Sequence, residues 1–191
     1  MCDGSVLWTQ NLGDAVSGDI KVNVSESLQV EGTTPDAVIR TGIFAEALGG
    51  NGGNVFVDAK RVTVFGGANI AAYTYSEYRG GNVNVNGGMI TSATLGSGKP
   101  GLVKVKANDI LISGRNPDTF AGGGLITNAI ATDTSAANII VDTSSLRLEN
   151  GGVVSSSTQS SSNAGNIIIN AADFVEIKGR DLRNFPSTVT S

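Results

Sequence analysis

The sequence predicts an all-β protein: a right-handed parallel β-helix with three short strands in each coil, about six coils and no substantial helix. Three observations predict this fold. A short motif recurs along the chain, apolar and polar residues alternate in short runs, and the segments between these runs are rich in glycine, serine, threonine and asparagine. Strands this short do not form a stable sheet alone, so the coils must stack to complete a core.

The first strand of each coil follows a Gly-Asn pair and alternates at period two. Clear copies begin at Gly53, Gly81 and Gly165, and looser copies begin at Gly18, Gly101 and Ala137. Alternation places one face of each strand inside. Superimposed coils therefore predict two inward columns, with Val55, Val83, Val103, Ile139 and Ile167 in one and Val57, Val85, Val105, Val141 and Ile169 in the other.

Two further strands are expected in each coil. The second contains an alternating pair, at Leu28/Val30, Val62/Val64, Ile110/Ile112, Leu146/Leu148 and Val175/Ile177, and only the copy at Gly81 lacks it. The third is rich in small residues and is expected to begin near Ile39, Ile70, Ile90, Ile126 and Val154. Its outward column is expected to contain Arg40, Ala71, Thr91, Thr127 and Ser155.

Polar residues also recur in register. Asparagines before the first strand form a predicted column of Asn54, Asn82, Asn138 and Asn166, with Asp19 in register, whose side chains can bond along the stack. A second column follows the first strand and contains Asn23, Asp58, Asn86, Lys106, Asp142 and Asn170. We interpret this second column as turn capping, because Asn and Asp side chains suit turn backbones.

The repeat divides residues 1–191 into one β-helix segment. Residues 1–17 are expected to belong to a partial preceding coil, with its third strand at Val6 to Thr9. The complete coils are predicted at 18–52, 53–80, 81–100, 101–136 and 137–164, and an incomplete last coil at 165–191. Both ends break within the repeat, which predicts a fragment of a longer array.

Composition excludes several classes of function. Histidine is absent, so imidazole bases and histidine-ligated metals are excluded, and the single cysteine, Cys2, permits no internal disulfide. A net charge of −4 without a basic cluster argues against nucleic acid and anionic membrane as partners. We expect no catalytic residue, no metal site and no cofactor. The first twenty residues lack an export signal, so any such signal would lie outside this chain.

The ordered repeats resemble the filamentous-haemagglutinin-type exoproteins of two-partner secretion, in their cyanobacterial, Gly- and Asn-rich form. The residues that carry the resemblance are the starts Gly53 to Ala59 and Gly165 to Ala171, the third strand at Gly67 to Ala72, and the Gly-x-x-Pro-Asp loops. The resemblance implies a right-handed β-helical shaft, export through an outer-membrane transporter partner, an extracellular or cell-surface location, and a role in adhesion, biofilm or surface structure. It implies no catalytic residue, and the family's N-terminal secretion domain is not present in these residues.

The candidate recognition surface contains the three tyrosines of the chain. Tyr73, Tyr75, Tyr78 and Arg79 lie in one expected loop, and Phe120 lies in another. Aromatic side chains stack on sugars and anchor protein contacts, so this surface fits a polysaccharide or another cell-surface ligand. In the alternative interpretation, the rings cover the coil that lacks a second strand.

Three other functions remain open. A carbohydrate-active lyase or glycoside hydrolase needs a tight group of carboxylates on one face, whereas Asp58 and Asp142 are expected at turn positions of the second polar column and Asp109 at the next corner. A self-stacking filament subunit would pair its exposed strand edges end to end. An ice- or surface-binding protein needs a regular rank of outward threonines, which Arg40 and Ala71 interrupt. We therefore expect a non-catalytic structural or adhesive shaft segment.

Overall fold

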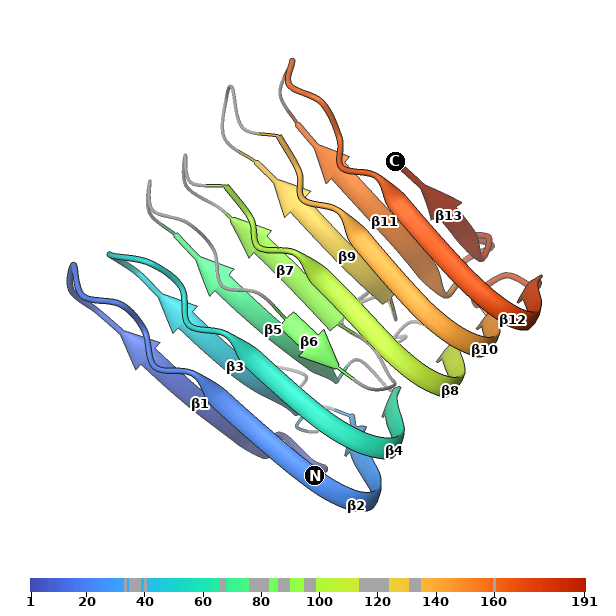
Figure 1. Cartoon of the computed structure of the whole chain (residues 1–191), viewed down its shortest axis with the longest axis horizontal. Coiled ribbons are helices and arrows are strands. Elements are labelled where there is room, and N and C mark those ends of the chain that lie inside the picture. The colour runs from blue at the N-terminus through green and yellow to red at the C-terminus, as the bar shows by residue number, and fades with distance from the viewer. Residues whose placement is uncertain are drawn as a thin grey trace.

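The chain folds into two sheets of parallel strands in a computed structural model. The structure describes residues 1–32, 34, 39, 41–65, 68–75, 83–85, 90–94, 99–113, 124–130, 135–159 and 161–191, with the backbone alone at 60, 61, 65, 83–85 and 90–94. The described part contains no helix. Figure 1 shows the even-numbered strands in front of the odd-numbered ones, with the N-terminus at one end of the stack and the C-terminus at the other.

The strands alternate between the two sheets along the chain. Sheet A contains β1 (Val6–Asn11), β3 (Gly42–Ala47), β5 (Asn69–Thr74), β7 (Ile90–Thr94), β9 (Gly124–Ala129), β11 (Val153–Thr158) and β13 (Thr188–Thr190). Sheet B contains β2 (Ile20–Glu31), β4 (Val55–Phe65), β6 (Val83–Val85), β8 (Val103–Ser113), β10 (Ile139–Glu149) and β12 (Ile167–Ile177). Spatial order follows chain order in both sheets, so each passage of the chain adds one strand to each sheet.

The expectation of three separate strands per coil is corrected in sheet B. The predicted first and second strands run on as one strand, for example from Val103 to Ser113. Register shifts between Val24 and Ser27, and between Thr143 and Ser145, interrupt the ladder only locally. A bulge bends a strand without ending it, so pairing continues on both sides of the bend. β6 has three residues, as the missing second pair predicted.

The predicted inward columns of sheet B are confirmed by the strand register. Val55 pairs with Val83, Val83 with Val103, Val103 with Ile139, and Ile139 with Ile167. The column from Val57 to Ile169 is aligned in the same way. Fully buried aliphatic residues from both sheets form the core between them. Burial of one such side chain stabilises the fold by about 1.5–3 kcal/mol.

Sheet A differs from the prediction at two strands. β3 begins at Gly42, not near Ile39, and Ile43 pairs with Ile70 in the inward column. In β9 the inward residue is Leu125, not Ile126, because Leu125 pairs with Ile90 and Val154. β1 pairs with β3, which confirms the strand expected at Val6 to Thr9, and β13 pairs with β11 near the C-terminus.

The outward column predicted for the ice-binding alternative is wrong at Thr127, whereas Ala71, Thr91 and Ser155 share one register position as predicted. Thr127 points inward and is fully buried, and its hydroxyl donates a hydrogen bond to the carbonyl of Ala137 at 2.7 Å. The outward column instead runs through Phe44, Ala71, Thr91, Ile126 and Ser155. Arg40 lies outside the described residues. A small-residue strand has weak apolar periodicity, so its inward face could not be identified from the sequence alone.

The glycine of the Gly-Asn motif has a packing role. A Cβ atom on Gly53 would lie 2.2 Å from the carbonyl oxygen of Gly18, and one on Gly165 would lie 2.0 Å from that of Ala137. Both oxygens belong to the preceding copy of the motif. At Gly53 and Gly165 the neighbouring copy thus approaches too closely for a side chain, which explains the glycine at these two positions.

The asparagine column is confirmed where the structure describes it. The backbone N–H and Nδ2 of Asn54 donate to Oδ1 of Asp19 at 2.8 and 2.9 Å. The backbone N–H of Asn166 donates to Oδ1 of Asn138 at 2.8 Å. Asn82 lies outside the described residues. These side-chain acceptors bond to the next copy of the motif and help to hold the copies in register.

Candidate functional site

The first candidate site is a group of aromatic side chains on the outer face of sheet A. We call Trp8, Phe44, Tyr73 and Tyr75 the aromatic patch. Trp8 on β1 pairs with Phe44 on β3, and the ring of Phe44 stacks on Tyr73 with centroids 6.3 Å apart. Tyr73 and Tyr75 have centroids 6.5 Å apart in a tilted arrangement. Three neighbouring segments of sheet A thus bring four rings together.

The inner rings of the patch are held by their neighbours. A Cβ on Gly42 would lie 2.4 Å from Cζ of Phe44, so the Phe44 ring lies against a position that only glycine leaves open. Nδ2 of Asn69 donates a hydrogen bond to the Tyr73 hydroxyl at 2.8 Å. The outer members are open to solvent, because Trp8 is 51% and Tyr75 43% exposed. The patch is therefore a supported surface with two accessible rings.

A carboxylate lies at the rim of the patch. Glu46 pairs with Tyr73 in the sheet register and accepts a hydrogen bond from Nε2 of Gln10 at 3.0 Å. Partial burial of the ring, and then the negative charge of Glu46, raise the pKa of the Tyr75 hydroxyl. The patch thus combines apolar ring faces with hydroxyl, amide and carboxylate groups.

We expect Tyr75 to titrate at higher pH in the folded protein than in the unfolded chain. A raised pKa means that folding favours the neutral phenol, so this contribution to stability is present below the ordinary tyrosine pKa and is lost as the pH rises through the raised value. Ultraviolet titration of a Tyr73→Phe/Tyr78→Phe variant measures Tyr75 alone. Adding Glu46→Gln should lower the titration midpoint of Tyr75 part of the way toward its value in the unfolded chain. A midpoint in the folded protein at or below that of the unfolded chain would contradict the raised pKa of Tyr75.

The structure shows only part of the predicted recognition surface lying together. Tyr73 and Tyr75 lie together, whereas Tyr78, Arg79 and Phe120 lie outside the described residues. The sequence argument missed Trp8 and Phe44. It began the third strand near Ile39, which placed Arg40 in the outward column where the structure has Phe44. The correct register of β3 would have aligned Trp8, Phe44 and the tyrosines.

The second candidate site is a hollow of about 940 Å³ in sheet B, where the strands bend. We call it the polar groove; its polar side chains are Asp58, Lys106, Asn108, Asp142, Ser144 and Asn170. Lys106 pairs with Asp142 and Asp142 with Asn170, which confirms this part of the predicted polar column. The interpretation as turn caps is wrong, because these residues lie within continuous strands. Their side chains line an open surface instead.

The carboxylates of the polar groove lie on strands that are not neighbours. Asp58 lies on β4 and Asp142 on β10, with β8 between them. Because β8 is adjacent to β10 and β4 lies beyond β8, about two strand spacings of roughly 4.8 Å or more separate the two positions, on the order of 10 Å. Glycoside hydrolysis needs carboxylates about 5–9.5 Å apart, so this separation lies at or beyond the upper end of that range and does not favour such a pair. Among the described residues, no group of three histidine, cysteine, aspartate or glutamate side chains could hold a metal ion.

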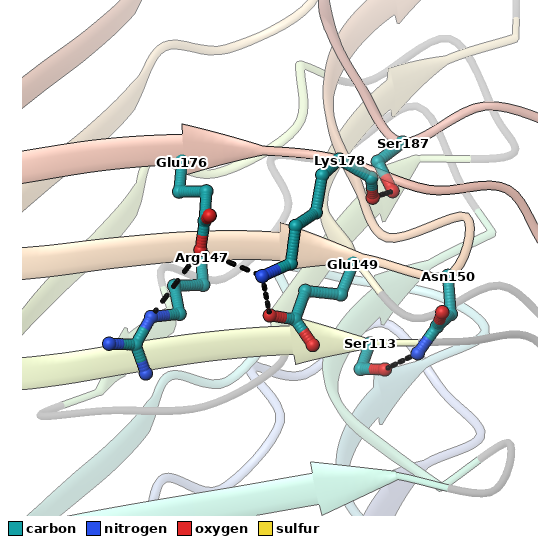
Figure 2. A network of polar contacts seen from close by, with 7 residues as sticks. All are labelled: Ser113, Arg147, Glu149, Asn150, Glu176, Lys178 and Ser187. Carbon is teal, nitrogen blue, oxygen red and sulfur yellow. Dashed lines mark hydrogen bonds and ion pairs between the residues drawn. The ribbon is translucent and has the colours of Figure 1, made fainter.

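A charged cluster joins the last two strands of sheet B (Figure 2). Nζ of Lys178 lies 3.2 Å from Glu149 and 3.1 Å from Glu176, and Arg147 lies 3.6 Å from Glu176. The two carboxylates raise the pKa of Lys178, Glu176 first. Arg147 also lies over the ring of Phe174, 5.1 Å from its centroid. Ion pairs this exposed contribute little stability.

Comparison of the chain with models of protein families, with curated proteins and with solved structures finds no match. Within the described residues, no helix is long and apolar enough to cross a membrane. The fold and the two sites therefore define the class to which the described part belongs: an all-β protein of two stacked parallel sheets, with an aromatic surface on one sheet and a polar groove on the other.

Proposed function

We propose that this chain is a segment of a right-handed parallel β-helix of about six coils. Strands in strict chain order within both sheets, and aliphatic columns that continue from coil to coil, support this architecture. Each coil contacts its neighbours and builds length without changing the cross-section, so the segment acts as a stiff, elongated spacer.

Within this architecture, the chain serves as a non-catalytic adhesive shaft of a secreted bacterial surface protein. The resemblance of its repeats to filamentous-haemagglutinin-type exoproteins supports this role, and with it an extracellular location and export through an outer-membrane transporter. The separation of Asp58 and Asp142 supports a role without catalysis.

The observation that carries the adhesive role is the aromatic patch. Its exposed Trp8 and Tyr75 flank the stacked Phe44 and Tyr73 on the outer face of sheet A. Contiguous exposed apolar surface rimmed by polar groups marks binding sites, and tryptophan and tyrosine are enriched among residues that dominate binding energy. Ring faces with nearby hydrogen-bonding groups match the two-sided chemistry of a sugar, so the proposed ligand is a cell-surface saccharide.

Trp8→Ala and Tyr75→Ala should each weaken saccharide binding by about tenfold, the loss typical of an aromatic anchor. The purified chain is tested against a panel of neutral and acidic polysaccharides, and retained binding and newly formed reducing or unsaturated ends are scored together. Phe185→Ala is the control, because Phe185 is 50% exposed outside the patch. Unchanged binding by both patch variants would overturn the adhesive role, and new chain ends would overturn the non-catalytic one.

A second candidate function is that of a self-stacking filament subunit. Strands at both ends of the stack expose residues from otherwise buried columns: Leu7 is 43%, Val175 45% and Ile177 47% exposed. Exposed strand edges with apolar columns are templates for pairing with a second copy. Light scattering over a wide concentration range tests this idea. A mass that grows with concentration supports the filament, and a constant monomer mass rejects it.

A further inference from the structure

We propose that the polar groove of sheet B is a second binding site, which takes an uncharged, linear polysaccharide lying across the strands. The site is separate from the aromatic patch, because the two lie on the outer faces of different sheets with the core between them.

The spacing of the groove suits an extended polymer. Lys106, Asp142 and Asn170 occupy the same register position on consecutive strands β8, β10 and β12, and all three line the hollow. Neighbouring strands are about 4.8 Å apart, so the row presents one polar side chain at each such step. This step is close to the length of one pyranose residue in an extended chain. Successive sugars can therefore meet successive strands.

The chemistry of the row favours hydroxyl groups over charged ligands. A carboxylate only accepts hydrogen bonds, an ammonium group only donates them, and an amide does both. A sugar hydroxyl also does both, so it can pair with Asp142, Lys106 and Asn170 in turn. Lys106 and Asp142 carry opposite charges on adjacent strands, so a polyanion or a polycation would be attracted by one of them and repelled by the other.

Some hydrogen-bonding atoms of the row remain available to a ligand. Nδ2 of Asn170 donates to Oδ1 of Asp142 at 2.8 Å, which orients both side chains. Oδ2 of Asp142 and Nζ of Lys106 have no hydrogen-bond or ion-pair partner in the described part of the chain. Asp142 is half-buried while Lys106 is exposed. A donor and an acceptor on adjacent strands are thus available to a ligand.

Small side chains complete the groove. Ala59, Ala107 and Ala171 line the same hollow at equivalent positions on β4, β8 and β12, one residue beyond the polar row. Ala59 is buried in the core and Ala107 packs against it, so no large side chain fills the hollow at these positions. A hollow with a few placed polar groups is a common form of ligand site.

The proposal is tested in the background Trp8→Ala/Tyr75→Ala, which removes the exposed rings of the aromatic patch. Isothermal titration calorimetry measures binding of a soluble neutral β-glucan, of polygalacturonate and of chitosan. We expect the β-glucan to bind more tightly than the two charged polymers. Lys106→Ala and Asp142→Ala should each weaken β-glucan binding at least about fivefold, since each removes one hydrogen-bonding group from the row.

Two control variants show whether a loss of binding comes from the polar groove. Lys104→Ala removes an exposed lysine from the same strand outside the groove, and should leave binding unchanged. Lys106→Arg keeps a donor and should retain most of the affinity. Absent β-glucan binding in this background, equal binding of a charged polymer, or full affinity in both alanine variants would overturn the proposal. None of these outcomes bears on the aromatic patch, whose own variants are compared in the native background.

Discussion

Leu146→Ala will lower the free energy of unfolding by about 3 kcal/mol, within the range of about 2–5 kcal/mol for truncating a buried leucine. Leu146 is fully buried in the column between Ile110 and Val175. Its neighbours lie on stacked strands whose spacing is set by backbone hydrogen bonds, so they cannot close in readily on the cavity. Denaturant unfolding followed by far-ultraviolet circular dichroism measures the loss.

Leu111→Ala is the control for this prediction. Leu111 lies next to Ile110 on β8, but it points outward and is 48% exposed. The same chemical change there should alter stability by no more than about 0.5 kcal/mol. Equal effects of the two substitutions would show that the inward column through Leu146 is not part of the core.

Gly53→Ala will destabilise the fold by about 2 kcal/mol, because the added methyl group must displace the backbone of the preceding coil. The new Cβ would lie 2.2 Å from the carbonyl oxygen of Gly18, and an oxygen in the main chain cannot rotate away as a side chain can. Gly165→Ala should act in the same way at the far end of the stack, against Ala137. Thermal and denaturant unfolding of both variants test this prediction.

Gly18→Ala provides the matched control at the equivalent position of the first motif copy. A Cβ there would lie 3.8 Å from Cγ2 of Thr9, an ordinary contact. Loss of glycine's freedom in the unfolded chain should make this variant neutral or slightly more stable. If Gly53→Ala and Gly18→Ala behaved alike, close stacking of the copies would not explain the glycine repeat.

These variants distinguish two contributions to the stability of the fold, which are apolar burial and close backbone packing. The aliphatic columns supply the apolar burial that drives folding, and the glycines allow the coils to approach closely enough for that burial. Serine, threonine and asparagine then satisfy backbone groups at the corners. The hydroxyl of Ser156, for example, donates to the carbonyl of Ala137 and accepts from the N–H of Gly165. A surface with few charges is therefore compatible with a well-bonded interior.

The alternating aliphatic pairs and the Gly-Asn repeat were sufficient to predict the parallel, all-β fold, the register of sheet B and the short strand at Val83–Val85. This was possible because a valine, isoleucine or leucine at every second position has only one stable orientation, toward the core. Only the tertiary structure decided which face of the small-residue strands points inward, since alanine, serine and threonine are accepted on both sides. That orientation places Phe44 beside Trp8 and Tyr73, and the bend in sheet B opens the groove around Lys106 and Asp142. Both candidate sites depend on contacts between strands distant in sequence, which local patterns do not encode.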